Sequence, residues 1–160
     1  MELLVLNLLN GISFGVILFL CASGLSLVLG LMRIVNLAHG ALYMVGAYIG
    51  WSLSVEYGLN FGLAVLAAGL GAALLGIVME RGFLCRLHGQ LDAQVLITVG
   101  FVYIMMNSAL WIWGPMPHAP FTAPYLSGSF DVMGWTYPVA RIVIIFIGLI
   151  LATGLWLLQD

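Results

Sequence analysis

The chain of 160 residues is 64% hydrophobic and only 6% charged, and its six acids and four arginines give a formal net charge of −2 at pH 7. Soluble domains contain about 45–50% apolar and about 25% charged residues, so this composition excludes a water-soluble enzyme with a charged surface. The charge balance also excludes a basic nucleic-acid-binding protein. Twenty glycines and eight methionines are typical of helices that pack closely in lipid. The composition therefore predicts an all-α integral membrane protein, built as a polytopic helical bundle.

The first apolar run extends from Leu3 to Met32, thirty residues without a charge, and ends at Arg33. An unbroken helix of this length would be about 45 Å long, whereas the hydrocarbon core of a bilayer is about 30 Å thick. We therefore expect this span to tilt, to break or to extend into a headgroup region. The weakest points are expected at Asn10-Gly11 and Ser23-Gly24.

Four further apolar runs follow, at residues 41–55, 59–79, 93–113 and 139–158. No segment alternates apolar and polar residues as the strands of a membrane barrel do. The chain is therefore expected to contain about five transmembrane helices, one of them broken, in a single domain over residues 1–160.

The distribution of arginine predicts the orientation in the membrane. If the N-terminus lies outside, the loops after the first and third spans face the cytoplasm and carry Arg33, Arg81 and Arg86, while only Arg141 lies on the other side. Cytoplasmic loops carry an excess of basic residues, so we expect this orientation.

Residues 114–138 form a segment rich in proline and aromatic residues, on the extracytoplasmic side in this orientation. It contains all five prolines of the chain. Proline at this density is incompatible with a regular helix. The aromatic side chains indicate either a belt at the membrane interface or an outer platform where a partner docks.

Small residues repeat every four positions at Ala64, Ala68, Ala72 and Gly76. This spacing places them on one helix face, where small side chains let another helix approach closely. We interpret them as a packing surface rather than a binding site.

A mixed segment of polar and apolar residues connects the third and fourth spans, at residues 80–94. Its leucines at positions 84, 87 and 91 would share one face of a short helix lying in the interface, although Gly89 weakens any helix there. The segment is either a plain cytoplasmic loop or a contact surface for a cytoplasmic subunit, with Arg81 and Arg86 as the candidate contacts.

The sequence contains no motif for catalysis or cofactor binding. It has no phosphate-binding glycine loop followed by lysine, no His-Glu-x-x-His and no Gly-x-Ser-x-Gly. Its three histidines lie far apart along the chain. We therefore expect no enzymatic activity, no metal site and no cofactor.

The most informative segment is Gly24 to Tyr48, where polar residues interrupt two apolar runs. Asn36 and His39 would share one helix face, and Gly40 follows directly. An unsatisfied polar group in hydrocarbon costs several kcal/mol, so these side chains must find partners. Two interpretations remain open: an interfacial turn in which Asn36 caps the next helix, or a broken helix that lines a pathway.

This segment resembles the signature of permease subunits in bacterial ABC importers for branched-chain amino acids, with Asn36-Leu37-Ala38-His39-Gly40 at its centre. Weaker similarity extends over Asn10–Gly15, Met79–Arg81 and Val95–Pro115. Importers of urea and short amides share a very similar signature.

The resemblance implies a permease subunit of the bacterial inner membrane without catalytic activity of its own. Such subunits assemble with a second related permease, two cytoplasmic ATPase subunits and a periplasmic substrate-binding protein. By this analogy Asn36, Ala38, His39 and Gly40 would shape the translocation path or its gate. The alternatives are a urea or short-amide permease and a membrane scaffold or assembly protein that transports nothing.

Family members are about twice as long as this chain, and the segment that grips the ATPase usually lies in their later half. We therefore expect residues 1–160 to be the N-terminal part of a longer permease. The turn Arg86-Leu87-His88-Gly89 also replaces a loop that is richer in proline and arginine in the family.

Overall fold

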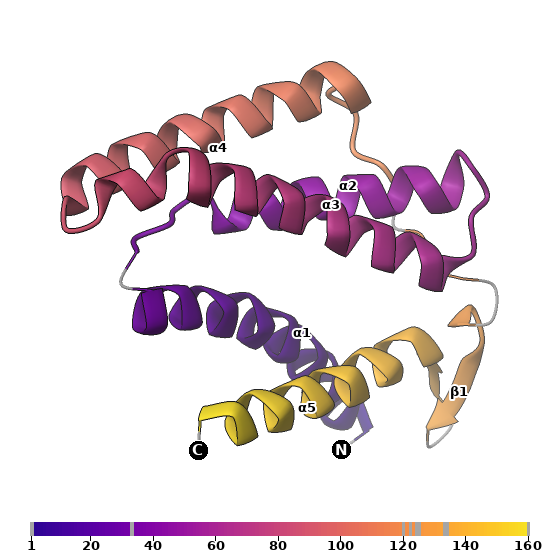
Figure 1. The fold of residues 1–160 in the computed structure, drawn as a ribbon. Coiled ribbons are helices and arrows are strands. Elements are labelled where there is room, and N and C mark those ends of the chain that lie inside the picture. The colour runs from indigo at the N-terminus through magenta and orange to yellow at the C-terminus, as the bar shows by residue number, and fades with distance from the viewer. Residues whose placement is uncertain are drawn as a thin grey trace. The chain divides into compact units, whose positions relative to one another are not determined.

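The computed structural model describes residues 2–32, 34–119, 121, 123, 126–132 and 135–159 (Figure 1). Arg33, one of the arginines expected on the cytoplasmic side, lies outside the described residues, as do two of the five prolines, Pro120 and Pro124.

Helices make up most of the described chain. The long helices are α1 (Glu2–Leu27), α2 (His39–Val55), α3 (Phe61–Gly82), α4 (Leu91–Trp113) and α5 (Val139–Gln159). A π-helical turn, η1 (Val28–Met32), extends α1, and a 3-10 turn, η2 (Leu84–Leu87), precedes α4. The predicted helical class and the five predicted helices are confirmed.

The helices begin and end where local chemistry permits. Asn60 precedes α3, and its Oδ1 accepts the Gly62 N–H at 2.9 Å, so one of the free donors of the first turn is satisfied. Gly114 follows α4 with φ of +80°, a backbone conformation that favours glycine.

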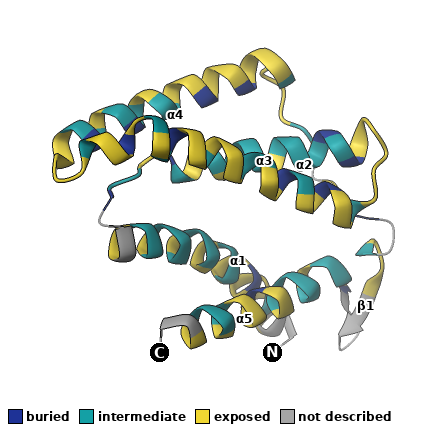
Figure 2. Ribbon diagram, viewed as in Figure 1, coloured by how far each residue is buried: buried dark blue, intermediate teal, exposed yellow. Residues whose placement is uncertain are grey.

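Within the part of the chain that the structure describes, four helices are long and apolar enough to cross a membrane: Asn7–Gly30, Phe61–Gly82, Leu91–Trp113 and Val139–Leu157. Helix α2 has 17 residues, at the lower end of the range that spans a bilayer. Many large apolar side chains on these helices are exposed, among them Trp111 and Leu96. Exposed residues extend along much of α3 and α4 (Figure 2). An exposed apolar surface of this kind is suited to lipid or to further membrane helices.

The predicted weak points in the first span are wrong. Helix α1 continues through both Asn10-Gly11 and Ser23-Gly24. The Ser23 hydroxyl donates to the Leu20 carbonyl at 3.0 Å, so it is satisfied within the helix and does not compete with it. The regular helix changes to the wider π turn only at Val28, and the interruption lies between η1 and α2.

The segment after α4 contains a hairpin that the proline count did not predict. Strand β1 (Ser129–Val132) pairs antiparallel with β2 (Trp135–Pro138), in a register that places Ser129 opposite Pro138. The β-branched and aromatic residues of this stretch favour strands. Pro138 is tolerated because it is the last residue of β2, and both strands of this two-stranded sheet are edge strands.

The chain divides into two compact units. In the unit of residues 25–121, α2 packs against α3 and α4 around a small core of Ala38, Ala41, Met79 and Met105. In the unit of residues 1–24 and 122–160, the Arg141 guanidinium donates to Asn10 Oδ1, and Gly148 of α5 lies so close to Val16 that no side chain fits there.

Candidate functional site

Residues 34–38 form a short non-helical link in front of α2. Ile34 and Ala38 are almost completely buried. The Asn36 Oδ1 accepts the Ala38 N–H at 3.0 Å, and the Asn36 carbonyl oxygen accepts the His39 N–H at 3.4 Å. Asn36 therefore forms a tight turn just before the helix, and α2 begins without a side-chain cap, contrary to the capping interpretation.

Gln94, which is not among the predicted site residues, holds this link in place. Its side chain is completely buried. The Oε1 accepts the Val35 N–H at 3.0 Å, while the Nε2 donates to the Leu87 carbonyl at 2.9 Å. One turn further along α4, the buried Thr98 hydroxyl donates to the Gln94 carbonyl at 2.8 Å. The signal in the sequence was a lone amide at the start of an apolar run, which must find partners if it is buried.

A groove of about 1340 Å³ runs along α2 and α3 and reaches the segment after α4. Its walls are apolar, and one wall consists mostly of small residues of α3: Ala68, Gly69, Ala72, Ala73 and Gly76. Among the described residues that line it, no Asp, Glu, Lys or Arg occurs. Its polar groups come from two histidines and a few hydroxyl and indole groups.

The four signature residues differ in burial and in their position relative to the groove. His39 lines the groove, whereas Asn36, Ala38 and Gly40 are not among its lining residues. Ala38 is fully buried, and Gly40 is exposed. The link therefore positions His39, the first residue of α2, while its neighbours shape the backbone.

The small-residue stripe lies between α2 and α3. A Cβ at Gly50 would be 3.4 Å from the Ala68 Cβ, and a Cβ at Gly46 would be 3.5 Å from the Ala72 Cβ. Ala64 is fully buried, and Gly76 faces Leu42. The helices are thus in direct contact beside the groove, and Ala68, Ala72 and Gly76 both contact α2 and line the groove.

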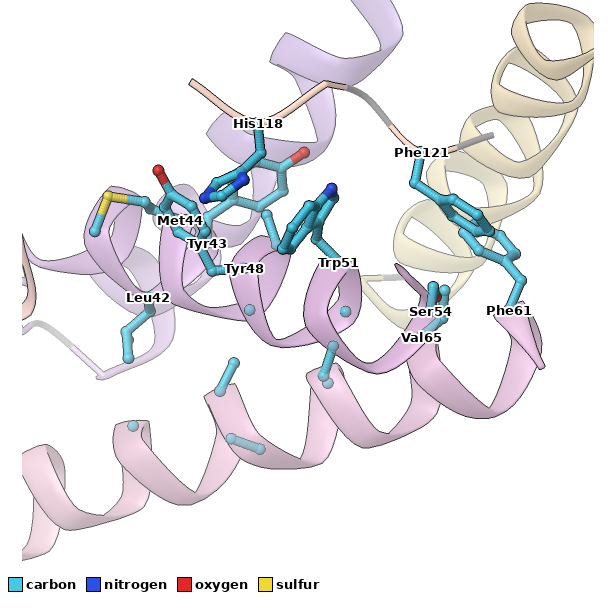
Figure 3. Close-up of a pocket in the computed structure, with 18 of the residues that line it drawn as sticks. Leu42, Tyr43, Met44, Tyr48, Trp51, Ser54, Phe61, Val65, His118 and Phe121 are labelled. Atoms are coloured by element: carbon cyan, nitrogen blue, oxygen red, sulfur yellow. The ribbon is translucent and has the colours of Figure 1, made fainter. Parts of the chain in front are cut away.

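Aromatic side chains of α2 and of the segment after α4 lie together along the groove (Figure 3). The His118 ring lies against the Trp51 ring, with centroids 4.1 Å apart, and Tyr48 stacks on Trp113 at 4.9 Å. The Trp51 indole donates to the Ala119 carbonyl at 3.2 Å, and the Trp113 indole donates to the Ser52 hydroxyl at 2.6 Å. These contacts hold the end of α4 and the segment after it against α2.

Arg81 and Arg86 are both exposed around the turn that follows α3. The predicted short helix over residues 84–91 is reduced to the single turn η2, because Gly89 adopts φ of +83° and ends it. The His88 Nδ1–H donates to the Cys85 carbonyl at 3.0 Å. No group of three His, Cys, Asp or Glu side chains within the described ranges could hold a metal ion.

The comparison with known families decides the identity. A family model described as the permease component of the branched-chain amino acid transport system matches residues 7–159. The chain belongs to this permease family. The resemblance inferred from the signature segment is thereby confirmed, and the chain is a multi-pass membrane protein of a bacterial permease family.

Several curated permeases are similar to this chain. The high-affinity branched-chain amino acid permease LivM of Escherichia coli K12 is 34% identical over 110 residues, which cover 66% of this chain and 25% of LivM. LivM of Salmonella typhimurium has the same identity and coverage. LivH of E. coli K12 is 32% identical over 69 residues, or 41% of this chain and 22% of LivH.

The alignments thus cover about a quarter of the length of these relatives. No solved structure matches the chain significantly.

Proposed function

We propose that the chain is a membrane-spanning permease subunit of an ATP-driven importer and forms part of the translocation path for branched-chain amino acids. The observation that carries this proposal is the family match over residues 7–159, together with a groove that His39 of the signature segment lines.

The groove suits an amino acid with an aliphatic side chain. Its apolar walls can take up a branched side chain, and the small residues of α3 leave room for it. Because no charged side chain lines it in the described part of the chain, the ammonium and carboxylate groups would rely on hydrogen bonds. His39 lies at the N-terminus of α2, where the helix dipole favours a carboxylate.

The chain would work in a complex. We propose as partners a second related permease, two cytoplasmic ATPase subunits and a periplasmic substrate-binding protein. The ATPases would supply the energy, since this chain has no ATP-binding motif of its own.

An uptake assay tests the path assignment. The full transporter is assembled in inner-membrane vesicles or cells with the double variant His39→Ala, Asn36→Ala, and uptake of labelled leucine is measured. We expect uptake to fall while the amount of inserted protein stays unchanged. Asn107→Ala is the control, because this asparagine is exposed on α4 and does not line the groove. Normal uptake by the double variant would show that the assignment is wrong.

The same preparation separates the alternatives. Competition by excess urea or acetamide, with none by valine, would favour a short-amide permease. A scaffold protein would bring down no ATPase and no second permease on purification.

The orientation is also a proposal, with the N-terminus outside and residues 114–138 on the extracytoplasmic side. Cys85 is exposed on η2 and offers a direct test after Cys21 is replaced by alanine. A membrane-impermeant maleimide should label Cys85 in inverted vesicles and leave it unlabelled in intact cells. The opposite pattern would reverse the orientation.

A further inference from the structure

Gln94 bridges two segments that lie far apart in the sequence, the link before α2 and the turn before α4. Its amide oxygen bonds to the Val35 N–H, 59 positions earlier, and its amide nitrogen bonds to the Leu87 carbonyl at the end of η2. Both partners are backbone groups, so the bridge holds the course of the chain itself. Because the Gln94 side chain is fully buried, water does not replace either bond without opening the packing.

The turn at one end of this bridge has exposed side chains. Cys85, Arg86 and His88 are exposed there. The turn is held by its own bonds: the Arg86 N–H donates to the Phe83 carbonyl at 3.2 Å, and the Gln90 N–H donates to the Leu87 carbonyl at 3.0 Å. A displacement of the exposed residues would therefore also displace the Leu87 carbonyl, because these bonds hold the turn together.

The link at the other end leads directly to the groove. Val35 is followed by the Asn36 turn, whose side chain fixes the Ala38 N–H, and His39 comes next and lines the groove. A displacement of Val35 would therefore reach His39 through a short stretch that the Asn36 turn and the buried Ala38 hold in place.

We propose that Gln94 is a positioning residue that couples the exposed turn Leu84–Leu87, with His88, to the position of His39 in the groove. A displacement of the turn is then transmitted to His39 through Gln94. The coupling is a property of this chain alone. It rests on the proposed function in one respect, that the groove is the translocation path.

The test uses the full chain in membranes, with Cys21→Ala, and involves no transport. Native Cys85 is modified with a bulky maleimide, and the rate at which diethylpyrocarbonate modifies His39 is measured by mass spectrometry. His118, which also lines the groove, is the internal reference. We expect modification of Cys85 to raise the rate at His39 relative to His118 by about fivefold, the lower end of typical couplings between sites.

In the Gln94→Leu variant the same modification of Cys85 should leave the rate at His39 unchanged, because both bonds are missing. A merely structural Gln94 would shift the unmodified rate without removing the response to the label. Gln90→Leu is the matched control: this glutamine lies one turn earlier, is exposed and makes no capping bond, so the response should persist.

A second measurement needs no variant at position 94. In the otherwise native chain, labelling Cys85 should speed amide hydrogen exchange in the peptide that contains Val35, but not in the turn around Gly58. The proposal is overturned if the label changes neither His39 nor Val35, or if the response survives in Gln94→Leu. Either failure leaves the transport assignment standing, and loss of that assignment leaves the coupling measurable.

Discussion

The contact between α2 and α3 can be tested by two glycines that differ in one respect. Gly50 and Gly69 both line the groove. A Cβ at Gly50 would be 3.4 Å from the Ala68 Cβ, whereas a Cβ at Gly69 would have no neighbour within 4 Å. Gly50→Leu therefore places a large side chain against α3, and Gly69→Leu places the same side chain in open space.

The expected difference in the free energy of unfolding follows from comparing Gly50→Leu with Gly69→Leu. Leucine in a helix interior is favoured over glycine by somewhat less than 1 kcal/mol, and this gain applies at both positions, so it cancels in the difference. Overpacking costs about 1–3 kcal/mol, and it applies only at Gly50. Gly50→Leu should therefore have a free energy of unfolding about 1–3 kcal/mol lower than Gly69→Leu. Gly50→Ala should be nearly neutral or slightly stabilising, because its Cβ makes an ordinary van der Waals contact.

Reversible unfolding in mixed micelles, followed by tryptophan fluorescence, measures these differences. A difference of one or two kcal/mol changes the ratio of folded to unfolded chain about 5–30-fold, which such a titration resolves. Both leucine variants should also reduce leucine uptake, because both narrow the groove. Equal stability of the two leucine variants would refute the close approach of α2 and α3 at this point.

Two further predictions concern single hydrogen bonds. Asn60→Ala removes the acceptor of the Gly62 N–H and should destabilise the start of α3 by about 0.5–2 kcal/mol, seen as faster amide exchange over its first turn, whereas Asn60→Asp should largely preserve it. Ser52→Ala leaves the Trp113 indole N–H without its acceptor and should cost about 1–3 kcal/mol, with a shift in tryptophan emission. Ser52→Thr keeps the hydroxyl and should behave like the native chain, and an unchanged emission in Ser52→Ala would contradict the observed bond.

Much of the helical architecture could be predicted because each apolar run is long and each boundary has a local cause. The predicted run at 139–158 corresponds to α5 (Val139–Gln159), and the run at 59–79 corresponds to α3, which begins after the Asn60 cap. The first span was misjudged at Ser23-Gly24, since the sequence does not reveal that the serine hydroxyl bonds back within the helix. The hairpin of β1 and β2 was missed because its residues were interpreted by their prolines rather than by their strand preference.

By itself the sequence determined the membrane class and the family signature around residues 36–40, since composition and short motifs are local properties. Only the tertiary structure decided that His39 alone of the four signature residues lines the groove, and that the stripe of α3 forms one of its walls. It also assigned a role to Gln94, whose partners Val35 and Leu87 lie on separate segments. The role of a buried amide depends on the groups to which it bonds, and the packing of the helices decides which groups come within bonding distance.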